Sequence, residues 1–131
     1  MVDKTKTIIL KELGLKTTKV RLQILKKLKH PIDAIELTRL LKVNKTSVYR
    51  ELKQLISKGL VEEIEFGDGK KRYELSSLGH HHHLFCLNCH KVEDVVIDEK
   101  LINQSLLVKS PNFMVVKHNL EFFGYCQSCQ L

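Results

Sequence analysis

Two Cys-x-x-C pairs constrain the second half of this 131-residue chain more than any other feature. One pair is Cys86 and Cys89, the other is Cys126 and Cys129, and 36 residues separate Cys89 from Cys126. Thiolates at this spacing wrap a tetrahedral ion from one tight turn, and two such turns close a four-cysteine zinc site. The alternatives are a redox dithiol or two buried thiol pairs. Neither accounts for two matching pairs beside a histidine cluster, so we expect a structural Zn²⁺ that pins the two ends of this segment together.

The histidine cluster, residues 80–83, lies just ahead of the first cysteine pair. Successive side chains of an extended strand point to opposite faces. His80 and His82 would then share one face, and His81 and His83 the other. Four consecutive histidines therefore make two pairs, each of which can begin its own metal site. The alternative is a solvated polar strand edge that binds no metal.

Charge is distributed unevenly along the chain. Residues 1–75 contain 18 Lys and Arg against 10 Asp and Glu, a net charge of +8, while residues 76–131 contain 4 against 5, a net charge of −1. A basic half joined to a nearly neutral half suggests that the first half meets a polyanion such as nucleic acid. Solubility alone would also account for a modest excess of lysine, so the local patterns must decide.

The apolar runs of the chain are short. None approaches the roughly 20 residues that cross a bilayer, and the N-terminus lacks the apolar core of a signal peptide. We therefore expect a cytoplasmic protein with no membrane partner, and in that compartment cysteines hold metal more often than they form disulfides.

The first half shows the pattern of a helix-turn-helix. Residues 18–29 carry Val20, Ile24, Leu25 and Leu28 on one face at helical spacing, with Lys and Arg on the other. A second, short helix is expected to begin at Asp33, and a third, capped by Asn44, to end at Gly59. Two short helices joined by about three residues are typical of a helix-turn-helix.

The start of the third helix carries the candidate DNA-reading side chains. Residues near the N-terminus of a recognition helix reach base edges in the major groove. The alternative is a solvated amphipathic helix. The side chains on the outward face of this segment, which we expect to contact DNA, are Lys45, Thr46, Ser47, Tyr49 and Arg50.

A β-hairpin is expected to follow this helix. Apolar positions in residues 61–66 and 73–75 flank a Gly-Asp-Gly turn at 67–69. Helix-turn-helix plus hairpin makes a winged helix over residues 1–75. Lys71 and Arg72 lie just past the tip, where a wing contacts phosphates without reading sequence.

The second half is expected to form a dimerisation module with an α/β fold. After a hinge at residues 76–79, we expect strands over 91–97 and 112–126, the latter broken at Gly124, and a helix over 99–109. A unit of this size cannot bury itself well alone, so a second copy would complete its core. The predicted fold class is α+β, with a winged helix followed by a zinc-stapled dimerisation domain over residues 80–131.

The chain resembles the ferric uptake regulator family of metal-responsive transcription repressors. The matching segments are GLKTTKVRLQIL, TSVYREL, RYEL, HHHHLFCLNCHKVED and HNLEFFGYCQSC, in the family's order and spanning nearly the whole chain. The resemblance implies a homodimer that binds palindromic operators in double-stranded DNA. It implies base contacts by Tyr49 and Arg50 and a minor-groove contact by Lys16. It also assigns the structural zinc to the four cysteines.

The resemblance further implies two exchangeable metal sites. The regulatory site falls on His30, Glu74, His81, His83 and Asp94, although the segment HPIDAIEL is one residue longer than usual before the helix-turn-helix. Because all four cysteines are committed to the structural zinc, Fe²⁺ or Mn²⁺ is favoured as the sensed metal. A zinc-sensing or peroxide-sensing member of the family is the alternative. The second site falls on His80, His82, His118 and an acid, Glu99 or Asp98, since Leu101 occupies the usual acidic position.

Two readings from other classes compete with a metal-gated regulator. A small metal-dependent hydrolase would use the histidine cluster as an open site with Glu74 as a base. A zinc-stapled DNA-binding module without sensing would use the histidines only to buffer metal.

The chain also departs from the family pattern by carrying His90 in place of a glycine, Val20 in place of a proline, and a short segment before the recognition helix.

Overall fold

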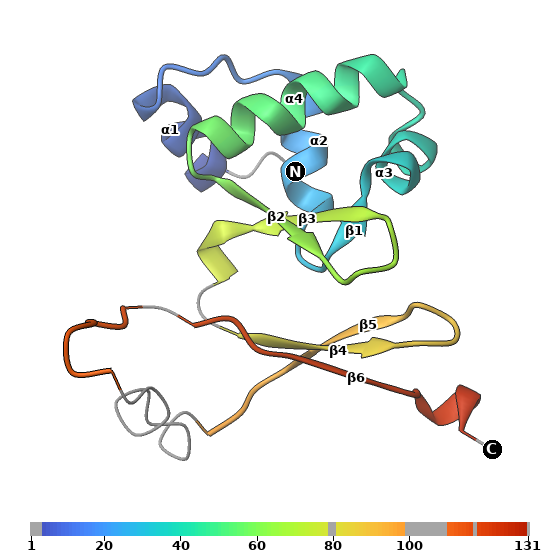
Figure 1. Ribbon diagram of the computed structural model, residues 1–131. Coiled ribbons are helices and arrows are strands. Elements are labelled where there is room, and N and C mark those ends of the chain that lie inside the picture. The colour runs from blue at the N-terminus through green and yellow to red at the C-terminus, as the bar shows by residue number, and fades with distance from the viewer. Residues whose placement is uncertain (1–3, 79–80, 99–109, 117, 131) are drawn as a thin grey trace. The chain divides into compact units, whose positions relative to one another are not determined.

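The computed structural model describes residues 4–78, 81–98, 110–116 and 118–130. The chain divides into two compact units, Met1–Gly79 and His80–Leu131. Each unit has its own three-stranded sheet (Figure 1). In the described residues, no helix is both long enough and apolar enough to pass through a membrane.

The first unit is a winged helix preceded by an additional helix. Its elements, in chain order, are α1 (Lys4–Glu12), α2 (Lys19–Lys27), β1 (Ile32–Asp33), α3 (Ala34–Leu41), α4 (Lys45–Ser57), β2 (Val61–Glu65), β3 (Lys71–Leu75) and the 3₁₀ helix η1 (Ser76–Leu78). The sheet order is β1-β3-β2, with both pairings antiparallel. The predicted helix-turn-helix and hairpin are therefore present. The short strand β1 and the helix α1 were not predicted.

Side-chain caps start the helices where the sequence predicted. The Asp33 carboxylate accepts a hydrogen bond from the Glu36 N–H at 2.8 Å, and the Asn44 side chain accepts one from the Ser47 N–H at 3.0 Å. These bonds satisfy N–H groups that the first turn of a helix leaves unpaired. Between α3 and α4, Lys42 adopts φ 54°, the left-handed conformation that turns the chain tightly from one helix into the next.

One apolar core joins the helices of the first unit to its sheet. It consists of Leu10, Leu15, Ile24, Leu25, Leu28, Ala34, Leu37, Val48, Leu52, Leu55, Val61 and Tyr73. Leu10 is completely buried, so α1 is part of this core. Arg21 lies on the buried side of α2 as well, whereas the sequence pattern had placed the basic side chains of this helix on its outer face.

The second unit is built on the strand order β5-β4-β6. Strand β4 (His82–Cys86) pairs antiparallel with β5 (Val92–Val95) and parallel with β6 (Glu121–Gly124), and the 3₁₀ helix η3 (Gln127–Cys129) follows. The long strand predicted over 112–126 is wrong, because β4 offers partners only to Glu121–Gly124. The helix predicted over 99–109 lies outside the described residues. Of the predicted hinge, residues 76–78 form η1 and Gly79 is not described.

Candidate metal centres and nucleic-acid interface

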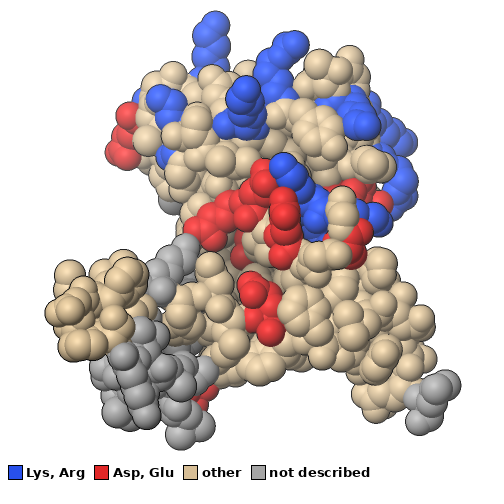
Figure 2. Space-filling model, in the orientation of Figure 1, with Lys and Arg blue, Asp and Glu red and all other residues tan. Residues whose placement is uncertain are grey.

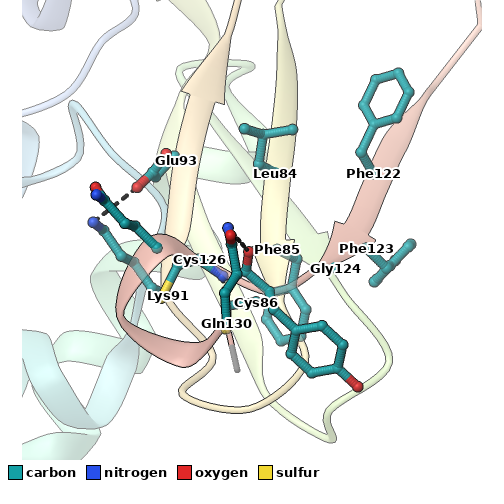
Figure 3. Close-up of a pocket in the computed structure, with 12 residues that line it drawn as sticks. Leu84, Phe85, Cys86, Lys91, Glu93, Phe122, Phe123, Gly124, Cys126 and Gln130 are labelled. Atoms are coloured by element: carbon teal, nitrogen blue, oxygen red, sulfur yellow. Dashed lines mark hydrogen bonds and ion pairs between the residues drawn. The ribbon is translucent and has the colours of Figure 1, made fainter.

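The sheet of the second unit brings the two cysteine pairs together. Cys86 ends β4 and lies in register with Gly124, the last residue of the parallel strand β6. Because the two strands end side by side, the turns that follow them meet, and Cys86 and Cys126 lie close together (Figure 3). The four sulfur atoms of Cys86, Cys89, Cys126 and Cys129 all lie within 4.8 Å of one another. Parallel pairing therefore closes the cluster that the spacing predicted.

The electrostatics of the cluster fit a bound cation. Hydrogen bonds from the backbone N–H groups of Cys126 and Cys89 lower the pKa of the Cys86 thiol to about 6. The Lys91 N–H acts in the same direction on Cys89, but the neighbouring thiols outweigh it and raise the pKa of Cys89 to about 11. The protein alone thus favours one thiolate and disfavours a second. Four thiolates at these separations need a positive ion, and the donor set is that of a structural zinc site.

Donors around the sulfur atoms hold the thiolates in place. The Cys126 N–H donates to Cys86 Sγ at 3.4 Å, and Asn88 Nδ2 donates to Cys129 Sγ at 3.3 Å. Asn88 was not predicted as part of the site, although its place between Cys86 and Cys89 is the signal that could have found it. Such donors orient the sulfur atoms and spread their negative charge.

A second cluster lies on one face of β4. His83 is in register with Asp94 on β5, and the His81 ring lies with its centroid 4.7 Å from that of His83. The distances to Asp94 Oδ1 are 3.7 Å from His83 Nε2 and 4.0 Å from His81 Nε2. Two imidazoles and a carboxylate at these separations can share one divalent metal ion. Mixed nitrogen and oxygen donors suit iron, manganese, zinc and their neighbours in the first transition row.

The opposite face of β4 carries a different histidine pair. The His82 ring stacks on that of His118 at 5.6 Å, with 9° between the ring planes, and His82 Nδ1 lies 3.0 Å from the Leu120 carbonyl oxygen. The alternation predicted for an extended histidine run is therefore observed for His81, His82 and His83. The two other predicted ligands of this face, His80 and Glu99, lie outside the described residues.

The remaining predicted regulatory ligands belong to the first unit. Glu74 lies on β3, opposite Glu62 of β2, and His30 is exposed in the turn between α2 and β1. The second unit thus brings together three of the five predicted regulatory ligands.

The outward face at the start of α4 is exposed and rich in donors. Lys45, Thr46, Tyr49 and Arg50 are exposed, and Ser47 is partly buried. Lys45 Nζ lies 5.8 Å from the centre of the Tyr49 ring, which is 43% exposed. In the view of Figure 2, Lys and Arg side chains gather over the helices of the first unit. Lys16 is also exposed, in the loop between α1 and α2. This arrangement suits a polyanionic partner.

The wing holds its two predicted phosphate contacts differently. Lys71 is exposed and lies 3.4 Å from Glu63 of β2. Arg72 is only 7% exposed, its guanidinium donates to both carboxylate oxygens of Asp68 at 3.1 and 2.8 Å, and it lies over the Phe66 ring at 5.5 Å. The Arg72 guanidinium, which was expected to contact DNA phosphates, is occupied by the Asp68 carboxylate. Arg72 therefore braces the wing from inside.

This brace predicts a pH-dependent stability. The hydrogen bonds from Arg72 stabilise the ionised carboxylate and lower the pKa of Asp68 from its ordinary value. A carboxyl with a lowered pKa in the folded state stabilises the fold above its unfolded pKa, about 3.9, and the effect is lost as the pH falls through the folded value. We expect Asp68→Asn to lower the free energy of unfolding by about 1.5–3 kcal/mol at pH 7, and by progressively less below about pH 4.

Urea unfolding followed by the helix signal, at a series of pH values, measures this difference. Glu65→Gln is the matched control, since Glu65 is an exposed carboxyl at the end of β2. A loss for Asp68→Asn that is the same at every pH would rule out the ionised brace.

Comparisons with known proteins agree on one family. Residues 12–123 match the model of the ferric uptake regulator family. The ferric uptake regulation protein of Vibrio cholerae is 37% identical over 131 positions, which cover 91% of this chain and 85% of that protein. The crystal structure of the Vibrio cholerae regulator aligns with a TM-score of 0.78 at 34% identity, over 92% of this chain and 99% of that one. The Helicobacter pylori regulator aligns with a TM-score of 0.79 at 26% identity, over 98% and 91% of the two chains.

The family match extends into both units and includes α4, the histidine strand and the first cysteine pair, Cys86 and Cys89. It sets aside the metal-dependent hydrolase, because the members of this family are transcription regulators and not enzymes. The chain therefore belongs to the ferric uptake regulator family, whose members are metal-responsive transcription regulators that bind DNA as dimers.

Proposed function

We propose that this protein is a metal-gated repressor that binds palindromic operators as a homodimer. The first unit reads DNA, and the second unit holds the metals and joins the two copies. The observation that carries the proposal is the pairing of two donor sets within one small sheet. One set is a closed group of four thiols, and the other is a thiol-free group of His81, His83 and Asp94. A permanent ion and an exchangeable ion can thus occupy the same unit.

Helix α4 is the recognition helix of this proposal. Tyr49 and Arg50 are its principal base contacts, supported by Lys45, Thr46 and Ser47, all of which lie in its first two turns. Lys16 reaches the duplex from the loop before α2. Lys71 adds a phosphate contact from the wing, while Arg72 shapes the wing from inside. Phosphate contacts set the register of a protein on DNA and base contacts set its specificity.

The structural ion is Zn²⁺, held by Cys86, Cys89, Cys126 and Cys129. It would supply a tetrahedral cross-link between the ends of β4 and β6. The regulatory ligands are His81, His83 and Asp94, completed by Glu74 and His30. Fe²⁺ or Mn²⁺ is the preferred ion, because none of these five ligands is a thiol and soft thiolates are what favour zinc. Zinc sensing and peroxide sensing are the alternatives.

A further exchangeable site lies on the other face of β4. Its ligands are His82 and His118, whose stacked rings lie together, with His80 and Glu99 as the remaining candidates. The Helicobacter pylori regulator, to which this chain is similar, has three functional metal binding sites, and three donor sets in this chain agree with that number.

The second unit also supplies the dimer contact. Leu84 and Phe122 lie in register on neighbouring strands and are 38% and 42% exposed, and Phe123 is 52% exposed. Apolar side chains gathered on one small sheet are typical of an interface with another copy. Two linked copies present two copies of α4, which suits two half-sites related by a two-fold axis.

Gating follows from linkage. The proposed regulatory ligands belong to both units, so a bound ion would favour conformations in which the ligands of the two units come together. If the two α4 helices of the dimer are then separated by the half-site spacing, metal strengthens DNA binding and DNA strengthens metal binding by the same factor.

A selection from a random duplex DNA pool tests the proposal. It is run with Mn²⁺ and, in parallel, with a chelator too mild to remove thiolate-bound zinc. A palindrome enriched only with Mn²⁺ is the expected result. The same palindrome in both arms would mean that the exchangeable ion is not the switch. No enriched sequence in either arm would overturn the proposal.

Arg50→Ala tests the recognition helix. We expect a loss of about 1–3 kcal/mol in binding to the selected duplex and a relaxed base preference at one position of each half-site. Arg39→Ala is the control, because Arg39 is exposed on α3 and pairs with Glu36. Fluorescence anisotropy with base-substituted duplexes measures both effects. Equal losses for the two variants, with unchanged base preference, would exclude Arg50 as a reader.

A further inference from the structure

A buried arginine joins three segments of the first unit. Arg21, on α2, is 6% exposed. Its Nε donates to Glu51 Oε2 at 2.7 Å and one terminal nitrogen donates to Gln54 Oε1 at 2.7 Å, so the guanidinium holds α4 from two positions. The other terminal nitrogen donates to the Lys16 carbonyl oxygen at 2.8 Å. One planar fork thus connects the recognition helix to the loop before α2.

The loop from Lys16 to Thr18 is wrapped around this arginine. The Lys16 carbonyl also accepts the Thr18 N–H at 3.1 Å, and the Thr18 hydroxyl accepts the Arg21 backbone N–H at 3.1 Å. Both the backbone and the side chain of Arg21 therefore hold the loop. The Lys16 side chain itself is exposed and carries a positive charge into solvent.

The other end of the fork holds the helix that carries the reading residues. Glu51 follows Arg50 directly, and Gln54 lies one turn further along the same helix. An α-helix is stiff over one or two turns, so fixing Glu51 and Gln54 fixes the direction of Tyr49 and Arg50. The position of Lys16 relative to these side chains then depends on Arg21.

We propose that Arg21 is a positioning residue for DNA recognition, which sets the Lys16 loop at a fixed place relative to α4. The proposal rests on the proposed function, in which Lys16 and α4 both contact the operator. Arg21 does not itself touch DNA. Through its three hydrogen bonds, the backbone of the Lys16 loop and the recognition helix meet the duplex in a fixed relation, so less backbone freedom is lost on binding.

The chemistry of arginine explains why this residue type stands here. A buried cation gains little net stability over an apolar side chain of similar volume, so stability alone is a weak reason for it. A guanidinium presents donors in a rigid plane that reaches acceptors on two sides, whereas a lysine ammonium is a point charge on a flexible stem. Arg21→Lys therefore keeps the charge but cannot hold Glu51, Gln54 and the Lys16 carbonyl together.

The test is a double-mutant cycle on the selected duplex, measured as affinity against salt concentration. Lys16→Ala removes a cation at the duplex and is expected to weaken binding about fivefold to tenfold and to lower the salt slope by about 0.9. Arg21→Lys is expected to produce similar changes, although it leaves the net charge unaltered. The affinity of the double variant is expected to lie within about twofold of that of whichever single variant binds DNA less tightly, because both changes disturb the same contact.

Two further variants make the cycle decisive. Arg39→Lys is the matched control, since Arg39 also pairs with a glutamate but lies exposed on α3, and we expect no change in affinity or slope. Gln54→Ala removes one α4 acceptor from an exposed position, so it keeps the fold and is expected to lower the affinity and the slope in the same direction.

The outcomes separate the inference from the function on which it rests. A wild-type protein without specific binding overturns the proposed function. Specific binding by the wild type, together with an unchanged salt slope for Arg21→Lys and Gln54→Ala, or additive losses in the cycle, overturns the positioning role alone. A purely structural arginine would lower the midpoint of unfolding and leave the slope of the folded protein unchanged.

Discussion

Cys126→Ser is expected to leave the protein without tightly bound zinc and to unfold the sheet of the second unit. A serine hydroxyl is a poor replacement for a thiolate ligand, and the three remaining sulfur atoms cannot complete a tetrahedral shell. Structural zinc sites contribute apparent binding free energies of about 10–16 kcal/mol, and this energy is folding energy where the site forms only with the fold. Of the changes considered for this protein, this one has the largest expected effect.

The second unit depends on the ion because its own core is small. Its described strands are only four or five residues long. The cysteine turns tie the ends of β4 and β6 together. Phe85 and Cys86 are buried in it, but Phe122, Phe123 and Tyr125 are exposed. Without the cross-link, little apolar burial opposes the entropy gained on unfolding.

Metal analysis and amide hydrogen exchange measure this outcome. We expect the zinc content to fall from about one ion per chain to almost none after treatment with a mild chelator, and the amides of β4, β5 and β6 to lose protection. Helices α2, α3 and α4 should remain protected, because they pack on the separate core of the first unit. Gln127→Ser, an exposed change at the start of η3 directly after Cys126, should behave as the wild type. Full zinc content and unchanged protection in Cys126→Ser would exclude the four-cysteine site.

Changing both His81 and His83 to alanine is expected to abolish the effect of Mn²⁺ on operator binding. Coupling between an effector and a ligand is typically about 1–3 kcal/mol, or roughly 5-fold to 150-fold in affinity. The change removes both imidazoles of a cluster whose described partner in the second unit is Asp94. The proposed ligands that remain, Asp94, Glu74 and His30, lack this imidazole pair and are not expected to retain a first-row divalent ion against a mild chelator. The ratio of affinities with and without Mn²⁺ should therefore fall to about one.

Two controls isolate the regulatory cluster. His90→Ala also removes a histidine of the second unit, but His90 stacks on Phe85 and belongs to neither histidine pair, so the Mn²⁺ response should persist. The zinc content of the double variant should stay at the wild-type value, because the cysteine cluster is a separate donor set. Operator binding that responds to Mn²⁺ in the double variant as in the wild type would contradict the proposed ligands. Wild-type binding that never responds to metal would favour a zinc-stapled DNA-binding module without sensing.

Local chemistry made much of this molecule predictable from its sequence. Asp33 and Asn44 start their helices because a short polar side chain satisfies N–H groups within three residues of itself. The alternation of His81, His82 and His83 follows from the two-residue period of extended backbone, which here begins one residue before β4. The Cys-x-x-C spacing predicts a metal site because each pair forms half of the coordination shell within one turn.

Partners distant in the sequence were decided only by the tertiary structure. Arg72 follows the wing tip as the sequence suggested, yet in the folded hairpin the Arg72 guanidinium pairs with Asp68 and is buried away from solvent. Only Glu121–Gly124 pair with β4, so β6 is four residues long although the apolar run around it is much longer.

Arg21 shows most clearly what the sequence determines and what only the tertiary structure decides. The basic side chains of α2 are predicted on its outer face, and for Arg21 that prediction is wrong. Arg21 stands three, four and seven residues before Ile24, Leu25 and Leu28 and is buried on the same side of α2. Its partners Glu51 and Gln54 lie 30 and 33 residues further along the chain. Periodicity reports which side of a helix is buried, because that depends on neighbours within a few turns. Which acceptors a buried guanidinium meets depends on how separate helices pack, and only the folded core brings those acceptors to it.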